Sequence, residues 1–167
     1  MIVRHPVRVM IANGSEVIRR LVTETLLDLE GFEAFSAVHG QDVIAQLAKV
    51  KPHVVVMGSD ATVMNGIETI RAIRERDPHL PIIMLCLSAA ARLKAINEEI
   101  PAGANDHAAF TVLVGHAASA KKNLQDELVP KIRLLADQCR GLTKSSVEDR
   151  AAHPRVTNVP VEIVSCV

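Results

Sequence analysis

Short apolar runs alternate with amphipathic stretches along most of the chain. The apolar runs are typical of strands buried on both faces, and the stretches between them carry apolar residues at helical spacing. The predicted strands are 7–12, 33–38, 54–57, 82–87 and, with poor strand propensity, 105–111. The predicted helices are 16–29, 41–49, 67–77, 89–100 and 112–139.

Two serines mark the starts of predicted helices. Ser15 and Ser88 each precede an amphipathic stretch, and a serine hydroxyl accepts a hydrogen bond from a free N–H group of the first turn. After Ser88, the residues Leu93, Ile96 and Ile100 recur at the spacing i, i+3, i+7. This spacing predicts that they share the apolar face of the helix.

Repeated alternation of strand and helix predicts an α/β fold. We expect a doubly wound, five-stranded parallel sheet in the order 2-1-3-4-5, with helices on both faces. Near the end of this unit, Pro130 either kinks the last helix or opens a new one. The unit is expected to span residues 1–140.

The remaining residues, 141–167, are predicted to be a linker and tail. Residues 141–160 are polar with little periodicity, and we expect them to be extended or disordered. Residues 161–167 (VEIVSCV) turn apolar again. They look like the first strand of a following domain.

Composition excludes several classes of partner. The 19 basic and 19 acidic residues cancel, and only 2% of residues are aromatic, so neither a basic footprint nor a stacking platform for nucleic acid is expected. No apolar run is long enough to predict a membrane span. The three cysteines lie far apart without metal-ligand spacing, which favours a reducing, cytoplasmic setting.

Four segments carry a resemblance to a known family. They are RVMIANGSEVIRRLV, KPHVVVMGSDATVMNGIETIRAIRERDP, PIIMLCLS and AGANDHAAF, in that order and spacing. They resemble the receiver domain of two-component response regulators, and most closely the receiver of the CheB-type chemotaxis methylesterases. The resemblance covers roughly residues 7–136 and implies a flavodoxin-like fold.

The resemblance also implies a phosphorylation site, and this chain departs from it at each chemical position. The acidic metal-binding pair falls on Asn13 and Gly14, and the acceptor aspartate falls on Gly58. The hydroxyl residue falls on Cys86, and the lysine falls on Phe110. The aromatic switch position falls on His107. These are the degenerate phosphorylation-site positions of the chain.

These replacements predict that the usual phosphoryl chemistry is absent. Gly58 cannot be a nucleophile, and Asn13 offers Mg²⁺ only a neutral carbonyl oxygen. Phe110 supplies no cation to the phosphoryl group. We therefore expect no catalytic residue, no cofactor and no bound metal, magnesium included.

Three further features have a functional and an ordinary interpretation, and a fourth has an ordinary one alone. Asp60 is the fallback acceptor, but two residues along a strand place it about 6.5 Å away, so a solvated loop aspartate is favoured. Cys86 is either a redox thiol or an inert residue at a strand end. His107 is either a pH sensor or a packed side chain. The arginines 71, 74 and 76 are expected to form a solvated helix face.

The leading functional hypothesis is a pseudo-receiver, a regulatory and protein-interaction module of a two-component or chemotaxis-type signalling protein. The resemblance places the output face on Ser88–Val129, where we expect a protein partner or a second copy of the chain. The alternative is the N-terminal regulatory fragment of a protein-glutamate methylesterase, whose catalytic site would lie outside this chain. A third hypothesis is an ordinary receiver with relocated chemistry. The chain itself is not expected to be an enzyme.

Overall fold

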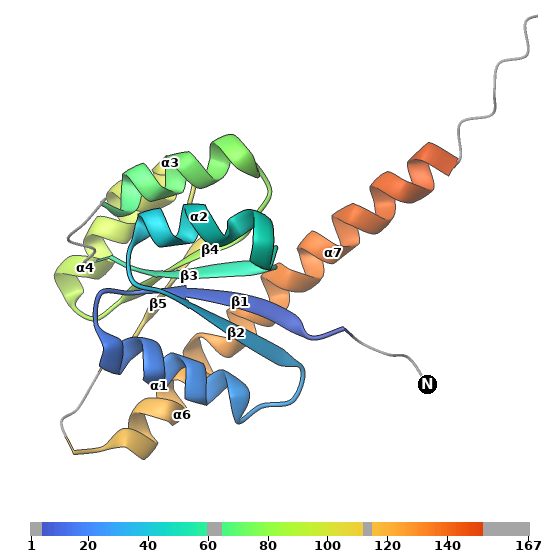
Figure 1. Ribbon diagram of the computed structural model, residues 1–167. Helices are drawn as coiled ribbons and strands as arrows, with labels where there is room; N and C mark the ends of the chain where they lie inside the picture. The colour runs from blue at the N-terminus through green and yellow to red at the C-terminus, as the bar shows by residue number, and fades with distance from the viewer. Residues whose placement is uncertain (1–4, 60–64, 112–114, 152–167) are drawn as a thin grey trace, which may run out of the picture.

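The computed structural model places five parallel strands in one sheet, in the order β2-β1-β3-β4-β5 (Figure 1). It describes residues 5–59, 65–111 and 115–151, and beyond residue 141 only their backbone. The strands are β1 (Val7–Ala12), β2 (Phe32–Ala37), β3 (Val54–Gly58), β4 (Ile82–Cys86) and β5 (Asp106–Ala109). The predicted fold class is confirmed.

The helices alternate with these strands along the chain. They are α1 (Glu16–Leu27), α2 (Gly40–Val50), α3 (Gly66–Arg76), α4 (Ala89–Lys94), α5 (Ile100–Ala102), α6 (Ala117–Glu127) and α7 (Val129–Ala151). A π-helix, η1 (Ala95–Glu99), joins α4 to α5. Toward its carboxyl end, α7 extends beyond the sheet (Figure 1).

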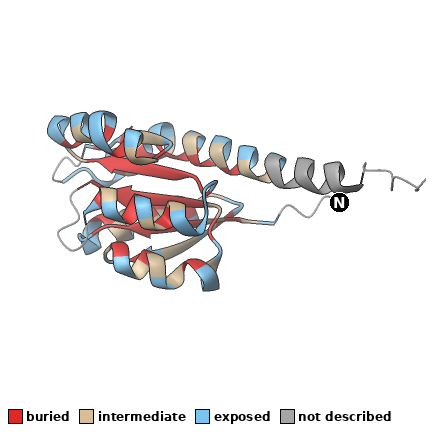
Figure 2. Cartoon of the chain, turned by 90° about the horizontal axis from the view of Figure 1, so that it is seen from above, coloured by how far each residue is buried: buried red, intermediate tan, exposed pale blue. Residues whose placement is uncertain are grey.

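The sheet separates two apolar cores. Alternate strand residues pack with α1, α6 and the start of α7 on one face, and with α2, α3 and α4 on the other. Figure 2 shows the buried residues concentrated in the sheet and on the inward faces of the helices. Every residue of β3 and β4 is buried, as their continuous apolar runs predict.

The helix starts follow the predicted chemistry. The Ser15 hydroxyl accepts a hydrogen bond from the Ile18 N–H (3.4 Å), and the Ser88 hydroxyl accepts one from Ala91 (3.0 Å). Both predicted caps are confirmed. Pro130 is the second residue of α7, so it opens a new helix rather than kinking a continuous one.

The predicted apolar face of the helix after Ser88 is wrong for two of its three residues, because only Ile100 packs against the core. Leu93 and Ile96 are 60% and 41% exposed, whereas Ala91, Ala95 and Glu99 are buried. Small alanines let this segment approach the sheet closely, and that contact outweighs the burial of two larger side chains. Leu93 and Ile96 therefore face outward, and a glutamate faces inward.

The start of the predicted linker is helical. The backbone is helical through Ala151, so residues 141–151 are not extended. Each added helical residue gains a hydrogen bond, and no proline interrupts the segment before Pro154. The apolar residues 161–167 lie outside the described residues. The division of the chain at residue 140 stays a prediction.

The predicted solvated arginine face needs a partial correction. Arg74 donates hydrogen bonds to the carbonyls of Gly103 (3.0 and 2.7 Å) and Leu80 (2.6 Å), and to Asn105 Oδ1 (2.9 Å). It is a partly buried tie between α3 and the starts of β4 and β5. Arg71 is exposed, as expected, and Arg76 is exposed but donates a hydrogen bond to the Ile44 carbonyl of α2 (2.7 Å).

Among the described residues, no helix combines the length and apolar character needed to cross a membrane. In the same ranges, no cluster of three or more His, Cys, Asp or Glu side chains is arranged to hold a metal ion.

Candidate functional site

The carboxyl ends of the strands form the edge where the resemblance places the phosphorylation site. Asn13 follows β1, Gly58 ends β3, Cys86 ends β4 and Phe110 follows β5. Because β1 and β3 are neighbours in the sheet, Asn13 and Gly58 lie side by side. Asp60 lies outside the described residues, so the structure does not place it.

The side chain of Asn13 fills the space above Gly58. A Cβ atom at position 58 would lie 2.2 Å from Asn13 Nδ2, closer than real Cβ contacts, and 3.1 Å from its Cγ, so the amide would have to shift. Asn13 is 9% exposed, and its Oδ1 accepts a hydrogen bond from the Ser15 N–H at 2.8 Å. The position that lacks an acceptor side chain is thus occupied by a held amide.

A cation lies at the turn between β1 and α1. One guanidinium nitrogen of Arg19 donates to the carbonyl of Asn13 at 2.6 Å and to that of Gly14 at 3.1 Å. These are the two positions where the resemblance places carboxylates, and neither supplies one. A neutral amide, a glycine and a guanidinium do not fit a divalent metal, which prefers carboxylate oxygens.

Two other positions of the resemblance are turned away from the edge. Cys86 is 2% exposed, and its thiol donates weakly to the Met84 carbonyl (3.7 Å). Phe110 is 1% exposed and belongs to the core that α1 and α6 cover. Its N–H bonds the Cys86 carbonyl (2.9 Å), extending the β4–β5 pairing. The ring therefore packs inside the protein, where the resemblance expects a lysine at the site.

His107 lies in β5, with its side chain 19% exposed. Its Nδ1 atom is buried without a hydrogen-bond partner among the described residues. Burial, and secondly the charge of Lys131, lower the pKa of His107, so the imidazole is neutral at pH 7. The Lys131 ammonium donates to the backbone carbonyl of His107. The structure does not bring His107 together with Asn13 and Gly58.

A buried polar cluster beside Gly58 was missed by the sequence reasoning. The Ser59 hydroxyl donates to both carboxylate oxygens of Glu99, at 3.0 Å each. The Lys94 ammonium donates to the Ser59 carbonyl at 3.0 Å and lies 3.6 Å from Glu99 Oε1. The one signal in the sequence was spacing, because Glu99 follows Ala91 and Ala95 at intervals of four.

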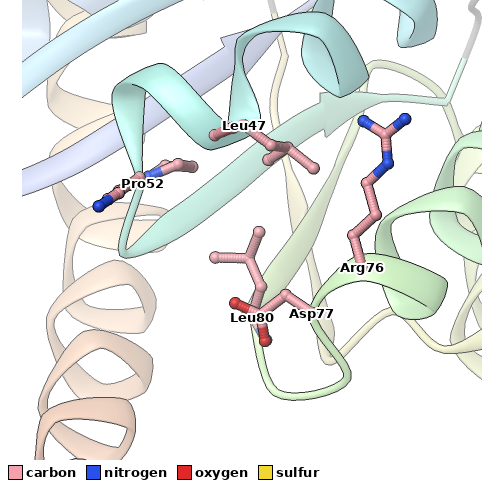
Figure 3. A pocket seen from close by; sticks show the side chains of 7 residues that line it. Leu47, Pro52, Arg76, Asp77 and Leu80 are labelled. Atoms are coloured by element: carbon pink, nitrogen blue, oxygen red, sulfur yellow. The ribbon is translucent and has the colours of Figure 1, made fainter.

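A pocket of about 530 Å³ opens at the opposite edge of the sheet, near the starts of β3 and β4 (Figure 3). Leu47 and Pro52 line it from α2 and the turn that follows, and Arg76, Asp77 and Leu80 from the end of α3 onward. This pocket is separated by the length of the strands from Asn13 and Gly58. It takes no part in the chemistry considered above.

Comparison with known sequences identifies related proteins. The profile described as "Response regulator receiver domain" matches residues 9–109. The chain is 31% identical over 138 residues to a protein-glutamate methylesterase/protein-glutamine glutaminase from Nocardioides sp., and 26% identical to one from Trichodesmium erythraeum. Each alignment covers 82% of this chain but only 37% or 39% of the relative. The chain thus spans about two fifths of the length of these curated relatives.

Solved structures show the same fold. The response regulator domain of Thermotoga maritima CheB superposes with a TM-score of 0.65 at 20% identity, covering 80% of this chain and 98% of that one. The chemotaxis response regulator CheY4 of Vibrio cholerae gives a TM-score of 0.56 at 26% identity, covering 72% and 98%. Both likenesses agree with the strand order.

Proposed function

The chain belongs to the response regulator receiver domain family, and from that membership we propose that it is a pseudo-receiver. It acts as a regulatory, protein-binding module of a two-component or chemotaxis-type signalling protein. It works without phosphorylation at the usual aspartate position and without magnesium. A cytoplasmic location is part of the same proposal.

The contact between Asn13 and Gly58 is the observation that carries this proposal. Phosphoryl transfer depends on a placed nucleophile and on cations around the transferred group. Here the nucleophile is absent, and the Asn13 amide fills its space, at 2.2 Å from where a Cβ would lie. Phe110 packs in the core and leaves the phosphoryl oxygens without a partner.

Protein binding is assigned to the face formed by Ser88–Val129. Among the described residues of this face, Leu93 and Ile96 are large apolar side chains that remain exposed. Exposed apolar side chains that lie together favour contact with another protein. A protein partner or a second copy of the chain is therefore expected here.

The test is labelling of the purified chain by a small phosphodonor, such as acetyl phosphate, followed by intact mass measurement. An ordinary receiver treated in parallel shows that the donor and magnesium are active. We expect no phosphoryl adduct on this chain, with magnesium or with chelator. A magnesium-dependent adduct, mapped by fragmentation to Asp60 or elsewhere, would overturn the pseudo-receiver proposal.

A second candidate is the N-terminal regulatory part of a protein-glutamate methylesterase. It is favoured by the names of the relatives and by the 37–39% of their length that the chain spans. Reading the gene downstream of the codon for Val167 tests it. An in-frame domain with a serine, histidine and aspartate hydrolase site would support this candidate, and a stop codon would exclude it.

A further inference from the structure

In the segment α4–η1, the buried and exposed residues differ from those that its sequence pattern predicts. Glu99 is 0% exposed, whereas Leu93 and Ile96 are 60% and 41% exposed. An ordinary amphipathic helix buries its apolar residues and exposes its charges. Both deviations cost free energy, so this segment is held in a disfavoured arrangement.

Glu99 is poorly compensated for a buried charge. An ionised carboxylate offers about four sites for hydrogen bonds. The described residues supply the Ser59 hydroxyl, shared between the two oxygens at 3.0 Å each. The Lys94 ammonium is 3.6 Å from Oε1, beyond hydrogen-bond distance, and its side chain is 38% exposed. An ion pair of this kind does not repay full desolvation of the carboxylate.

The backbone around Glu99 is closely fitted to it. A Cβ atom on Gly66, the first residue of α3, would lie 2.8 Å from Glu99 Oε1. Glu99 also ends the π-helix η1, and such helices are rare and concentrate at functional positions. A π-helical turn and an undercompensated charge meet at one residue.

The charges that face Glu99 are few among the described residues. Lys94, from the same segment, favours the ionised form, and Glu98 opposes it. Ser59 from the end of β3 contributes a neutral hydroxyl, and Gly66 and Met84 contribute no charge. Burial is the largest influence and raises the pKa of Glu99 above its ordinary value.

We propose that Glu99 makes α4–η1 a proton-gated segment. When Glu99 is neutral, the segment closes on the ends of β3 and β4. When Glu99 is ionised, the carboxylate gains solvation by leaving the interior, and the segment opens locally while the rest of the domain stays folded. Leu93 and Ile96 lie on this segment, so its use in controlling partner binding rests on the proposed function.

Hydrogen exchange on the full chain tests the inference directly. Protection factors, corrected for intrinsic exchange, are measured for the amides of α4 and η1 at about pH 5 and about pH 8. As the pH rises, we expect the protection of these amides to fall. The fall should be about tenfold for each unit by which the pKa of Glu99 in the closed segment exceeds its ordinary value. The amides of α3 should keep their protection. Protection that is independent of pH, or that increases with pH, would overturn the proposal.

Matched variants separate proton gating from a simple structural role. Glu99→Gln, which cannot ionise, should keep the segment closed at both pH values. Lys94→Met, which removes the facing cation and its hydrogen bond to the Ser59 carbonyl, should increase opening more at high pH than at low pH. Glu98→Gln, at an exposed neighbour that opposes ionisation only weakly, should keep the pH dependence and shift it slightly toward lower pH. Increased opening of Glu99→Gln at both pH values would mean that the ion pair holds the segment, and would also contradict the proposal.

A second measurement covers the case in which Glu99→Gln does not fold. The carboxyl carbon of Glu99 in the unmodified chain is followed by NMR across the same pH range, and the midpoint of its titration must coincide with the pH at which protection stops falling. Protection that levels off at a different pH would overturn the inference. None of these measurements uses a partner or a phosphodonor, so the inference and the proposed function can fail independently.

Discussion

At the scale of single residues, the pair Asn13 and Gly58 behaves as one unit. An asparagine side chain can fold over position 58 only if no Cβ is there, and the glycine leaves space that the amide then fills. The Ser15 N–H fixes the amide from the other side, at 2.8 Å. Restoring one partner alone therefore creates a collision and does not recreate a site.

Gly58→Asp is accordingly expected to lower stability and to restore no phosphorylation. The new side chain displaces the Asn13 amide and breaks its bond to Ser15, at a cost of about 1–3 kcal/mol. Urea unfolding and phosphodonor labelling with magnesium or chelator are the measurements. Gly14→Asp is the control, because a Cβ there has no atom within 4 Å, and its stability should be close to that of the unmodified chain. Magnesium-dependent labelling of Gly58→Asp would contradict this account.

His53 gives the domain a pH dependence of a definite sign. Its Nδ1 accepts a hydrogen bond from the Arg8 N–H (2.9 Å), which requires the neutral imidazole. Burial, and secondly Arg8, lower the pKa of His53 from 6.5 to about 4. A lowered pKa means that the unfolded chain binds the proton more readily, so stability is present above pH 6.5 and is lost as the pH falls toward 4.

Urea unfolding between neutral pH and about pH 5 should show this loss. His53→Asn keeps a hydrogen-bonding side chain that does not titrate in this range, and its stability should depend less on pH. His79→Asn, at an exposed position, serves as the control and should keep the dependence of the unmodified chain. Equal pH dependence of the two variants would remove the role assigned to His53.

At the scale of elements, the sequence predicts strands better than helix faces. The predicted ends of β1, β3 and β4 agree with the structure to within a residue, because an apolar run has the same meaning wherever it lies in a covered parallel sheet. A helix face also depends on how closely the backbone approaches the sheet. Small residues at 91 and 95 decide that approach, and the prediction gave more weight to Leu93 and Ile96.

Arg74 is an element-scale tie whose removal should be costly. It links α3 to the turns that start β4 and β5 through the carbonyls of Leu80 and Gly103 and the amide of Asn105. A lysine cannot reproduce this fork of donors. We expect Arg74→Lys to lower the free energy of unfolding by about 1–3 kcal/mol, measured in urea. The exposed Arg71→Lys is the matched control, and an equal effect of both would contradict the assignment.

At the scale of the whole molecule, the alternation of strands and helices and the four resembling segments were sufficient to predict the fold. The resemblance alone was also sufficient to locate the changed positions of the phosphorylation site. Their new arrangement could not, because the overlap of Asn13 with position 58 and the inward turn of Phe110 depend on side-chain packing between distant elements. The cluster of Ser59, Lys94 and Glu99 joins residues 40 apart, and its one local signal is the spacing of Glu99 from Ala91 and Ala95.

The exposed pair on α4–η1 provides a test of the proposed face as a whole. Leu93→Glu with Ile96→Glu should abolish capture of a partner from source-cell extract, or dissociate a homodimer in light scattering. Both side chains are exposed, so stability should change by less than about 0.5 kcal/mol each. Val17→Glu, on the 70% exposed Val17 of α1, is the control and should leave both properties unchanged. Loss of binding in the control as well would point to general charge effects.

Repair of the whole phosphorylation site should fail because one of its positions now belongs to the core. The minimal set is Asn13→Asp, Gly14→Asp, Gly58→Asp and Phe110→Lys, with Cys86→Thr to complete the switch. Phe110 is 1% exposed, so a lysine there leaves a void among apolar side chains and must carry its charge out of the interior. Loss of a buried phenylalanine side chain costs about 3–5 kcal/mol, a large part of the stability of a small domain.

We therefore expect Phe110→Lys, alone or within the set, to shift urea unfolding strongly to lower concentration. The repaired chain should take up phosphoryl poorly or not at all. Phe35→Lys is the matched control, because Phe35 lies on the edge strand β2 and is only partly buried, so the same change should cost much less. A variant with all five substitutions that is as stable as the unmodified chain, and is labelled in magnesium but not in chelator, would contradict this expectation. It would mean that the core beside β5 tolerates the loss of the Phe110 side chain, and that a lysine at position 110 can reach the phosphorylation site.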